Sequence, residues 1–506
     1  MLKFNTPLKR GVIFIVITFV YFLLGYLNYT RSFKIAFIGF FTIMFFDTLR
    51  FYFKNKVFNY LFYIVITVIF LNLGFQGLLR DTFGVAQDDL TIIQSIVDTD
   101  INETKEFLSQ YYLYIIKHIL LVSITLILYI RFILNQKLEV SNIKKTLWIT
   151  LFFYIVIHLN PSMRRSDPFV YFIFYYNRYQ HDIGITKKLD ATIKKNLKDS
   201  NMSFNYKGKD KTNIVVWVIG ESETKYNWSL YGYLRDTNKY IKKFQNEFLL
   251  IKNAKAAAPA TVSAFELMFT DATKKNPDLW MKSPNIVQIA NLAGYKTYWI
   301  SNQTSDRRGA INIFANSADT VVYTNKGRAR GEGSFDEVVL EPFFKAINDK
   351  ANKKFIIIHL MGSHPAYDYR YPKRFSIYTL NFSDKVMKNL LSRGRSRFAL
   401  VFRNLYDNSV LYSDYIRYKI LDSIKNSPYK HDTTLIYHPD HGQDVCHNSN
   451  FSGHNHSAKQ QWEIPMLLWG KDKKDFEYLN SLESVELDKV DKLILKVLAI
   501  QKEKNK

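Results

Sequence analysis

Two long runs without a charged residue constrain this chain more than any other feature of its sequence. Residues 11–30 and 57–79 contain no Lys, Arg, Asp or Glu and are rich in Phe, Ile, Leu, Val and Tyr. A helix needs about 20 predominantly apolar residues to cross the hydrocarbon core of a bilayer, and both runs meet that length. The sequence therefore predicts a membrane-spanning part.

Three further apolar stretches lie among the first 162 residues, and two of them contain isolated charges. One is interrupted by Asp47 and Arg50, and another contains Lys117 and His118. Their length still suits a transmembrane helix. We therefore expect a transmembrane domain of five helices over residues 1–162. The predicted spans are 11–30, 34–53, 57–79, 109–130 and 146–162.

The distribution of Lys and Arg predicts the orientation of these spans. Basic residues lie before the first span, between the second and third, and between the fourth and fifth, whereas the loop 80–108 is acidic. Cytoplasmic loops are enriched in Lys and Arg. We therefore expect a cytoplasmic amino terminus, with everything after residue 162 outside. Arg31 and Lys34 do not fit this distribution, because they follow the first span and so lie on the side predicted to be outside.

The overall charge indicates an anionic partner. The chain has 69 Lys and Arg against 45 Asp and Glu, a formal net charge of +24. No basic run with interleaved stacking aromatics is present and the globular part is expected outside the cytoplasm, so we expect no nucleic-acid partner. Attraction to anionic membrane lipids is the simpler explanation. The single cysteine, Cys446, excludes an intramolecular disulfide.

Residues 163–205 connect the membrane part to the remainder of the chain. They begin with aromatic and apolar residues between basic ones, a composition that suits an interfacial linker at the membrane surface. A plain helix packed on the next domain fits equally well. We expect a separate globular domain over residues 206–506.

From about residue 210, short strands alternate with helical stretches. This alternation predicts an α/β sandwich with a mostly parallel central sheet. Ligands of such sheets bind beyond the carboxyl ends of the strands. The predicted strands are 213–220, 295–301, 354–360, 433–438 and 464–470, and the predicted helical stretches are 283–294, 336–349, 406–426 and 487–500.

Carboxylates and imidazoles follow three of the predicted strands. Brought to one edge of the sheet, they form the ligand set expected for zinc. A single strand-end Glu or His is more often a hydrogen-bonded structural residue. Six of the chain's 11 histidines lie in these loops, however, and that coincidence favours a metal site. The residues are Glu221, His359, His364, His438, Asp440, His441, His454 and His456.

A hydroxyl that a metal would activate lies in "APATVSAFELMF", residues 258–269. Thr261 starts a predicted helix, and the positive end of a helix together with a cation favours the alkoxide form of a hydroxyl. The stretch "SAFE" has the Ser-x-x-Glu pattern of a capping box. We therefore assign Ser263 to the helix cap and Thr261 to the chemistry.

These motifs resemble those of the bacterial phosphoethanolamine transferases, of the alkaline-phosphatase and sulfatase superfamily. The resemblance includes the five predicted spans, so it covers nearly the whole chain. The matching segments, in family order, are "VVWVIGESETKYNWSLYGYLRDTN", "APATVSAFELMF", "YWISNQTSDRRG", "KFIIIHLMGSHPAYDYRYP", "YDNSVLYSDY", "HPDHGQ" and "EIPMLLWG".

The resemblance implies a multi-pass protein of the cell inner membrane with a sulfatase-like periplasmic catalytic domain. Its members transfer phosphoethanolamine from phosphatidylethanolamine to lipid A or to core sugars of lipopolysaccharide or lipooligosaccharide. Several members thereby confer polymyxin and cationic-peptide resistance. For this chain we expect the same reaction, through a phosphoethanolaminyl-threonine intermediate.

Carried over by position, the resemblance also implies site residues. Thr261 would be the nucleophile, and His364 and His454 would bind the donor headgroup and supply hydrogen bonds or move protons. One zinc ion or two is implied, with Mn²⁺ as the alternative. The implied metal ligands are Glu221, Thr261, Asp440 and His441, and the further substrate-binding candidates are Asn302 or Gln303, Arg307 or Arg308, His456 as a competitor of His454, and Gln443.

The chain departs from the family at Gln443, where many relatives have Glu; an anionic partner for the ethanolamine ammonium or for a second metal is therefore missing. It also lacks the disulfides of well-known relatives. A phosphoglycerol transferase of the lipoteichoic-acid or glucan type, which also uses Thr and a divalent metal, is the alternative function. A sulfatase would need a Cys or Ser nucleophile followed by Pro and Arg, which "ATVSAFE" lacks, and a silent scaffold would not retain all four metal positions.

Residues 375–403 are interpreted as an insertion after the "YRYP" loop. Their basic, amphipathic character suits either contact with an anionic glycolipid or simple cover of the domain. The acceptor itself is not identified by the sequence.

Overall fold

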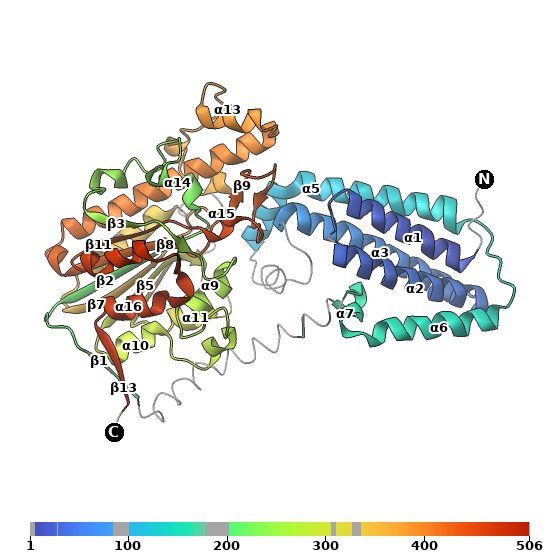
Figure 1. Ribbon diagram of the computed structural model, residues 1–506, viewed down its shortest axis with the longest axis horizontal. Helices are drawn as coiled ribbons and strands as arrows, with labels where there is room; N and C mark the ends of the chain where they lie inside the picture. The colour runs from blue at the N-terminus through green and yellow to red at the C-terminus, as the bar shows by residue number, and fades with distance from the viewer. Residues whose placement is uncertain are drawn as a thin grey trace. The chain divides into compact units, whose positions relative to one another are not determined.

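The computed structural model describes residues 6–27, 29–83, 101–164, 166–171, 173, 176–177, 202–304, 310–325 and 335–504. The chain divides into two compact units, one of residues 1–97 and 111–181 and one of residues 98–110 and 182–506. Figure 1 labels their helices and strands. Below, these are called the helical unit and the globular unit.

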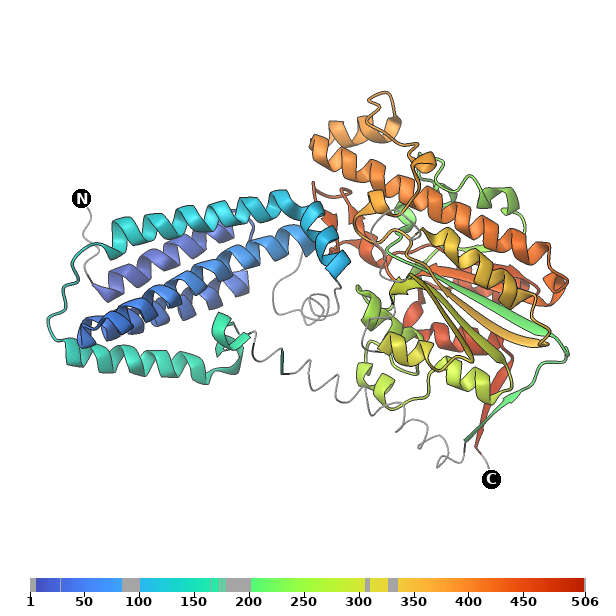
Figure 2. The ribbon, with the colours of Figure 1, turned by 180° about the vertical axis from the view of Figure 1, so that it is seen from behind.

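Long helices make up the helical unit, as the apolar runs predict (Figures 1 and 2). Among the described residues, three segments are long and apolar enough to cross a membrane: Tyr29–Phe53, Lys56–Thr82 and Tyr111–Leu134. The predicted count of five is not confirmed, because α1 and α6 have only 17 residues each. The helices are α1 (Pro7–Leu23), α2 (Tyr29–Phe53), α3 (Lys56–Phe83), α5 (Ile101–Leu128, continued by a π-helical turn over Tyr129–Leu134), α6 (Ile143–Leu159) and α7 (Pro161–Arg164).

The first helix is shorter than the uncharged run that predicted it. α1 ends at Leu23, whereas the run continues to residue 30. Gly25 has φ +78°, a left-handed conformation that glycine adopts without steric cost and that commonly ends a helix. α2 then begins at Tyr29. The run therefore supplies one helix and the turn into the next, rather than a single span over residues 11–30.

The charges inside the second predicted span are paired within the helical unit. Asp47 accepts hydrogen bonds from Arg10 Nη1 (3.1 Å) and from Arg50 Nε (2.7 Å). Arg10 also donates to the carbonyl of Gln136, and Tyr129 donates to the carbonyl of Arg10 (3.0 Å). Arg10 and Asp47 are fully buried. Ionisable residues in apolar helices normally face inward and pair with one another, and α2 follows that rule.

Lys117 and His118 of α5 have a similar explanation. Both contact Asp81 of α3, and the distance from His118 Nε2 to Asp81 Oδ2 is 2.7 Å. Gly77 makes room for the imidazole, because a Cβ there would lie 2.4 Å from His118 Cε1. The charged residues that interrupt two apolar stretches thus pair with residues of other helices.

Replacing Asp47 by Asn should destabilise the protein, because Arg10 would stay buried without its counter-ion. Breaking a buried ion pair typically costs about 3–5 kcal/mol, so we expect a clearly lower melting temperature of the full chain in detergent micelles. Lys144→Gln removes an exposed charge and is the control. Equal melting temperatures of the two variants would contradict a structural role of the cluster.

A seven-stranded sheet forms the centre of the globular unit, in the order β3-β11-β8-β2-β7-β5-β6. The pairs from β8 to β6 are parallel, and β11 is antiparallel to both of its neighbours. The predicted mostly parallel sheet is therefore confirmed, and all five predicted strands lie in it. The strands are β2 (Asn213–Gly220), β3 (Phe248–Ile251), β5 (Lys296–Thr304), β6 (Thr320–Asn325), β7 (Lys353–His359), β8 (Thr433–Pro439) and β11 (Met466–Gly470).

Helices cover both faces of this sheet. The side chains of β2 alternate between the two faces, so each face presents apolar side chains to the helices that cover it. Trp217 and Ile219 join the core cluster that includes residues of α9, α10, α11 and α16, whereas Val216 and Val218 join the cluster of α12 and α14. Every residue of β2 is buried, as expected for a central parallel strand. The helices are α9 (Thr261–Met268), α10 (Ile286–Leu292), α11 (Ala310–Ala315), α12 (Leu340–Ile347), α13 (Lys385–Ser392), α14 (Arg397–Lys425), α15 (Lys459–Trp462) and α16 (Val490–Val497).

Short strand pairs complete the globular unit, and one of them places the start of this unit before the predicted residue 206. Residues 202–205 belong to the globular unit rather than to the linker, because they pair antiparallel with the last strand. The rest of the predicted linker lies largely outside the described residues. The pairs are β1 (Met202–Tyr206) with β13 (Ile500–Lys504), β4 (Ala254–Lys255) with β12 (Val485–Glu486), and β9 (Asp444–Val445) with β10 (Ser452–Gly453).

The segment predicted as an insertion, 375–403, includes the start of a long helix. α14 begins at Arg397, so the last residues of the segment are the first turns of the long helix. Arg403 is buried, and its Nε donates to the carbonyl of Val445 (2.8 Å). Arg403 thus lies in the interior of the globular unit, where the apolar face of α14 packs on the sheet.

Candidate metal and nucleophile site

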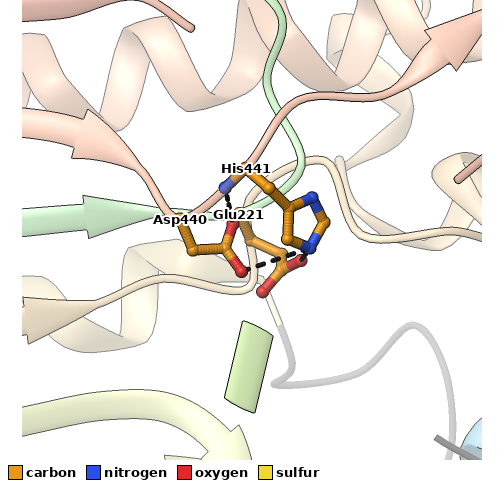
Figure 3. A group of neighbouring side chains, drawn as sticks. All are labelled: Glu221, Asp440 and His441. Atoms are coloured by element: carbon orange, nitrogen blue, oxygen red, sulfur yellow. Dashed lines mark hydrogen bonds and ion pairs between the residues drawn. The ribbon is translucent and has the colours of Figure 1, made fainter. Parts of the chain in front are cut away.

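The register of the parallel strands brings three ligand-type side chains together. Gly220 at the end of β2 pairs with Pro439 at the end of β8, so Glu221 and Asp440 follow side by side, and His441 comes next. One ligand atom from each of these three residues lies within 4.8 Å of the others, and all three are buried. Figure 3 shows the two carboxylates and the imidazole turned toward one another. We call them the Glu-Asp-His group.

The hydrogen bonds of Asp440 leave one of its oxygens for another ligand. Asp440 Oδ1 accepts from the backbone N–H groups of Ser222 (3.1 Å) and His441 (2.7 Å). Asp440 Oδ2 is buried and has no hydrogen-bond partner among the described residues, although His441 Nε2 lies 3.3 Å away. A buried polar atom without a partner is costly, and a cation at this position would satisfy it.

His441 is oriented toward the same point. Its Nδ1 lies 2.9 Å from the carbonyl oxygen of Gly442 and donates to it, so Nε2 carries the lone pair, 3.5 Å from Glu221 Oε1. Burial lowers the pKa of His441 and raises that of Asp440 to about 6, because the interior solvates charge poorly. A neutral imidazole held by a backbone carbonyl, with two carboxylates, suits Zn²⁺. The residues therefore fit the predicted metal.

Thr261 lies beside this group. Its Oγ1 is 3.3 Å from Glu221 Oε2 and 3.5 Å from His441 Nε2. It is also the first residue of α9, so the hydroxyl lies at the positive end of a helix. The structure thus brings all four predicted metal positions together.

The assignment of Ser263 to the helix cap is wrong. The residue in the N-cap position of α9 is Ala260, which makes no side-chain cap, and Ser263 Oγ donates to the carbonyl of Ala260 (3.1 Å). The Ser-x-x-Glu pattern misplaced the start because α9 begins two residues before Ser263. The sequence shows a capping pattern only locally, whereas the start of the helix follows from the approach of the chain to the sheet edge.

Two left-handed residues hold the backbone around Glu221. Ser222 has φ +59°, donates its hydroxyl to Glu221 Oε1 (2.8 Å), and accepts from Tyr406 Oη at its carbonyl (2.8 Å). Gly362, with φ +52°, approaches so closely that a Cβ would lie 2.8 Å from Glu221 N. Ser363 N donates to the carbonyl of Glu221 (2.9 Å). Glu221 is therefore positioned by the loop after β7 and by α14.

His454 lies against the group. Its ring centroid is 4.8 Å from that of His441 in an edge-on arrangement, and its Nδ1 is 3.3 Å from the carbonyl oxygen of Pro259. Burial lowers the pKa of His454 well below its ordinary value. His454 is therefore neutral. Its ring contact with His441 favours it over His456 as the histidine nearest the group.

Two other histidines of the predicted pattern have contacts in the core. His438 Nε2 accepts from Trp217 Nε1 (2.9 Å), and burial lowers the pKa of His438 to about 4. His359 packs with its ring centroid 4.7 Å from that of Phe265. His438 and His359 therefore have the structural role that is more common for a strand-end histidine.

Gln303 contacts the loop after β7, and Asn302 contacts Asp336, which in turn supports that loop. Asn302 Nδ2 donates to Asp336 Oδ1 (2.9 Å), and Gln303 Nε2 donates to the carbonyl of Leu360 (3.0 Å). Asp336 Oδ2 accepts from Gly362 N (2.9 Å) and so supports the loop that presses on Glu221. Asp336 cannot be singled out from the sequence, because it lies in an ordinary helical pattern and its partners are distant in sequence.

Gln443 accepts a hydrogen bond at Oε1 from Tyr367 Oη (2.6 Å), while its Nε2 is buried without a partner among the described residues. Tyr367 lies in the loop after β7, so Gln443 ties that loop to the segment after β8. Arg307 and Arg308 lie outside the described residues.

Comparison with known proteins identifies the family of the globular unit. Residues 213–484, more than half of the chain, match the sulfatase family. The chain belongs to this family. The matching range includes all four residues of the candidate site and the whole central sheet.

Curated relatives show which kind of sulfatase-family protein this chain is similar to. The phosphoethanolamine transferase EptC of Escherichia coli K12 is 30% identical over 325 residues, which are 62% of this chain and 54% of EptC. The phosphoethanolamine transferase CptA of Salmonella typhimurium is 28% identical over 329 residues, 62% of this chain and 55% of CptA. The predicted resemblance is confirmed. The chain spans about half the length of the curated relatives that it matches.

Solved structures agree with the fold. The C-terminal periplasmic domain of E. coli EptC, in complex with Zn, is 28% identical and covers 59% of this chain and 85% of that domain, with a TM-score of 0.53. The integral membrane protein lipooligosaccharide phosphoethanolamine transferase A from Neisseria meningitidis covers 98% of this chain and 94% of its own, with a TM-score of 0.64 and 17% identity. The second match shows a shared fold over both units.

Replacing Gly362 by Ala should disturb the site, because the new Cβ would lie 2.8 Å from Glu221 N and 2.9 Å from Glu221 O. Gly394→Ala is the matched control: Gly394 has φ +70° but nothing lies within 4 Å of its Cβ position. That control carries only the cost of a left-handed alanine, about 1–2 kcal/mol. We expect Gly362→Ala to lower the melting temperature of the full chain more than Gly394→Ala; equal losses would contradict the close contact.

Proposed function

We propose that this protein transfers phosphoethanolamine from phosphatidylethanolamine to a cell-envelope glycolipid, lipid A or a core sugar. The observation that carries the proposal is the position of Thr261 Oγ1, 3.3 Å from Glu221 Oε2 and 3.5 Å from His441 Nε2. A hydroxyl in contact with a buried metal-ligand set is the arrangement of an activated nucleophile. The relatives named as phosphoethanolamine transferases support the choice of transferred group.

Zinc, as one ion or two, is the proposed cofactor, with Mn²⁺ as the alternative. The complex of the E. coli EptC domain with Zn supports zinc. Bound by Glu221, Asp440, His441 and Thr261, the ion would lower the pKa of the threonine hydroxyl and offset negative charge on the phosphoryl oxygens.

The proposed reaction has two displacements at one phosphorus. In the first, Thr261 Oγ attacks the phosphorus of phosphatidylethanolamine, the bond from phosphorus to the diacylglycerol oxygen breaks, and phosphoethanolaminyl-threonine forms. The hydroxyl proton is lost and the diacylglycerol oxygen gains one. In the second, an acceptor oxygen attacks the same phosphorus, the bond to Thr261 breaks, and the threonine is restored.

His454 and His364 are the proposed proton donors and acceptors. His454 is in ring contact with His441, so its imidazole is placed to take part in proton transfer near the reacting oxygens. His364 lies within electrostatic reach of His454, and its Nδ1 is 3.5 Å from Arg370 Nη2. Each would give its proton back in the second displacement, so the site returns to its starting state.

We propose an inner-membrane location with a cytoplasmic amino terminus and a periplasmic globular unit. The three apolar helices and the alternation of basic loops support it. Anchoring would hold the site near lipid headgroups and so raise the local donor concentration. Addition of phosphoethanolamine to a phosphate of the surface glycolipid would reduce its net negative charge, because the added ammonium group is positive; this is the basis of the proposed polymyxin resistance.

Thr261→Ala should abolish both the release of diacylglycerol and the covalent adduct, whereas Thr261→Ser should retain part of the activity because it keeps a hydroxyl. The purified full chain is incubated with fluorescent phosphatidylethanolamine or phosphatidylglycerol, and the mass of the Thr261 peptide identifies the transferred group. Release from phosphatidylglycerol alone would contradict the proposal and support the phosphoglycerol alternative. An adduct on the Thr261→Ala protein would sink the nucleophile assignment.

Asp440→Asn should weaken zinc binding roughly 100-fold or more, because the substitution removes an anionic ligand and leaves the shape almost unchanged. Metal content is measured after desalting by inductively coupled plasma mass spectrometry. Asp475→Asn, at an exposed position, is the control and should retain zinc. Full zinc content in the Asp440→Asn protein would show that the metal lies elsewhere.

A further inference from the structure

A cavity of about 430 Å³ opens on the globular unit, lined by residues after Glu221, by α13 and by His447 of the β9–β10 hairpin. Three cationic and three tyrosine side chains contribute to its wall, and none of the described residues that line it is Asp or Glu. The cations are Lys225, Arg393 and Arg403, and the tyrosines are Tyr226, Tyr231 and Tyr233. The size is in the range of small-ligand sites.

Arg403 has no carboxylate partner of its own. It is 4% exposed, its Nε donates to the carbonyl of Val445 (2.8 Å), and its Nη1 lies 3.5 Å from Tyr233 Oη. The neighbouring Asp407 is engaged by Arg235 Nη1 (2.7 Å) and by Tyr233 Oη (2.6 Å). No carboxylate of the described residues lies within ion-pair distance of Arg403. A buried guanidinium in this position favours an anion in the cavity.

Arg393 adds a second available charge at the same cavity. It follows α13, its side chain is exposed, and it makes no side-chain hydrogen bond or ion pair within the described part of the chain. Lys225, by contrast, is paired with Glu463 at 2.7 Å. Arg393 and Arg403 are therefore the cations that a ligand can engage, one at the surface and one in the interior.

The tyrosines offer their rings rather than their hydroxyls. Tyr226 Oη donates to Glu463 Oε2 (2.8 Å) and Tyr231 Oη donates to the carbonyl of Ile251 (2.6 Å). Tyr233 Oη is bound to Asp407, as described above. With the hydroxyls engaged by the protein, the amphipathic rings remain for contact with the C–H face of a sugar.

We infer that this cavity binds a phosphorylated sugar, as the headgroup of the glycolipid acceptor. The phosphate contacts Arg393 and Arg403, and the sugar ring lies against the tyrosines. This inference rests on the proposed function, since it names the place of the acceptor. Lys225 and Tyr226 follow Glu221 closely in the chain, and His447 lies in the hairpin that precedes His454, so the acceptor would lie on segments that lead to the candidate site.

Binding is tested with the Thr261→Ala form of the full chain in detergent micelles, so that no transfer takes place. The probes are glucose 6-phosphate, glucose and inorganic phosphate, titrated by calorimetry. We expect glucose 6-phosphate to bind about tenfold or more tightly than glucose, because charge-assisted hydrogen bonds to guanidinium groups are among the stronger polar contacts. We also expect it to bind more tightly than inorganic phosphate, because of the ring contacts.

Arg393→Glu should weaken the binding of glucose 6-phosphate by about tenfold or more. Arg397→Glu is the matched control, since Arg397 is exposed, near in sequence and not part of the cavity wall. Equal weakening by both variants, or equal binding of glucose 6-phosphate and glucose, would overturn the inference. Binding of inorganic phosphate as tight as that of glucose 6-phosphate would overturn the sugar assignment. Failure of the proposed function is separate: the unaltered protein would not turn over phosphatidylethanolamine, while sugar-phosphate binding persisted.

Discussion

The pairing of β2 with β8 is the contact on which the candidate site depends. In the observed register Gly220 lies opposite Pro439, and this places Glu221 beside Asp440. A shift of one residue would turn each side chain of β2 to the other face of the sheet. Both faces are packed with large apolar side chains, including Trp217 on one and Val216 on the other. The hydrophobic core thereby sets the geometry of a polar site.

The site itself opposes the stability of the fold. Glu221, Asp440 and His441 are buried in mutual contact, and one oxygen of Asp440 lacks a hydrogen-bond partner among the described residues. Ser222 and Gly362 hold left-handed conformations next to them. Such local conflicts are expected where a protein positions reactive groups. A ligand that binds only the folded state stabilises it, so the proposed metal would couple occupancy of the site to stability.

Buried charges elsewhere in the chain show how the fold ordinarily treats them. Asp47 lies between two arginines in the helical unit, and Glu223 accepts from Arg417 in the globular unit (2.9 Å). These charges have partners across elements, which offsets the cost of removing them from water. Arg403 and the Glu-Asp-His group depart from that pattern. The departures lie at the two places for which we propose ligands.

The sequence by itself determined the classes of the two units and the five predicted strands of the sheet, and it pointed to Glu221, Thr261, Asp440 and His441 as candidate site residues. Apolar runs, strand-end polar residues and the start of a helix are local patterns, so a single sequence shows them. The edge strand β3 lies in the stretch "FLLIKNAKA", whose apolar start is strand-like in the sequence. The edge strand β6 was not predicted, because it is only half-buried and lacks the continuous apolar pattern of a central strand.

Only the tertiary structure decided which polar residues serve the core and which serve the site. His438 and His359 have the same strand-end position as the site residues, yet their contacts are with Trp217 and Phe265. Ser263 lies in a capping pattern but does not cap the helix, and Arg403 is charged but buried. Each outcome depends on contacts between segments far apart in the chain, and those contacts exist only once strand register and helix packing are set.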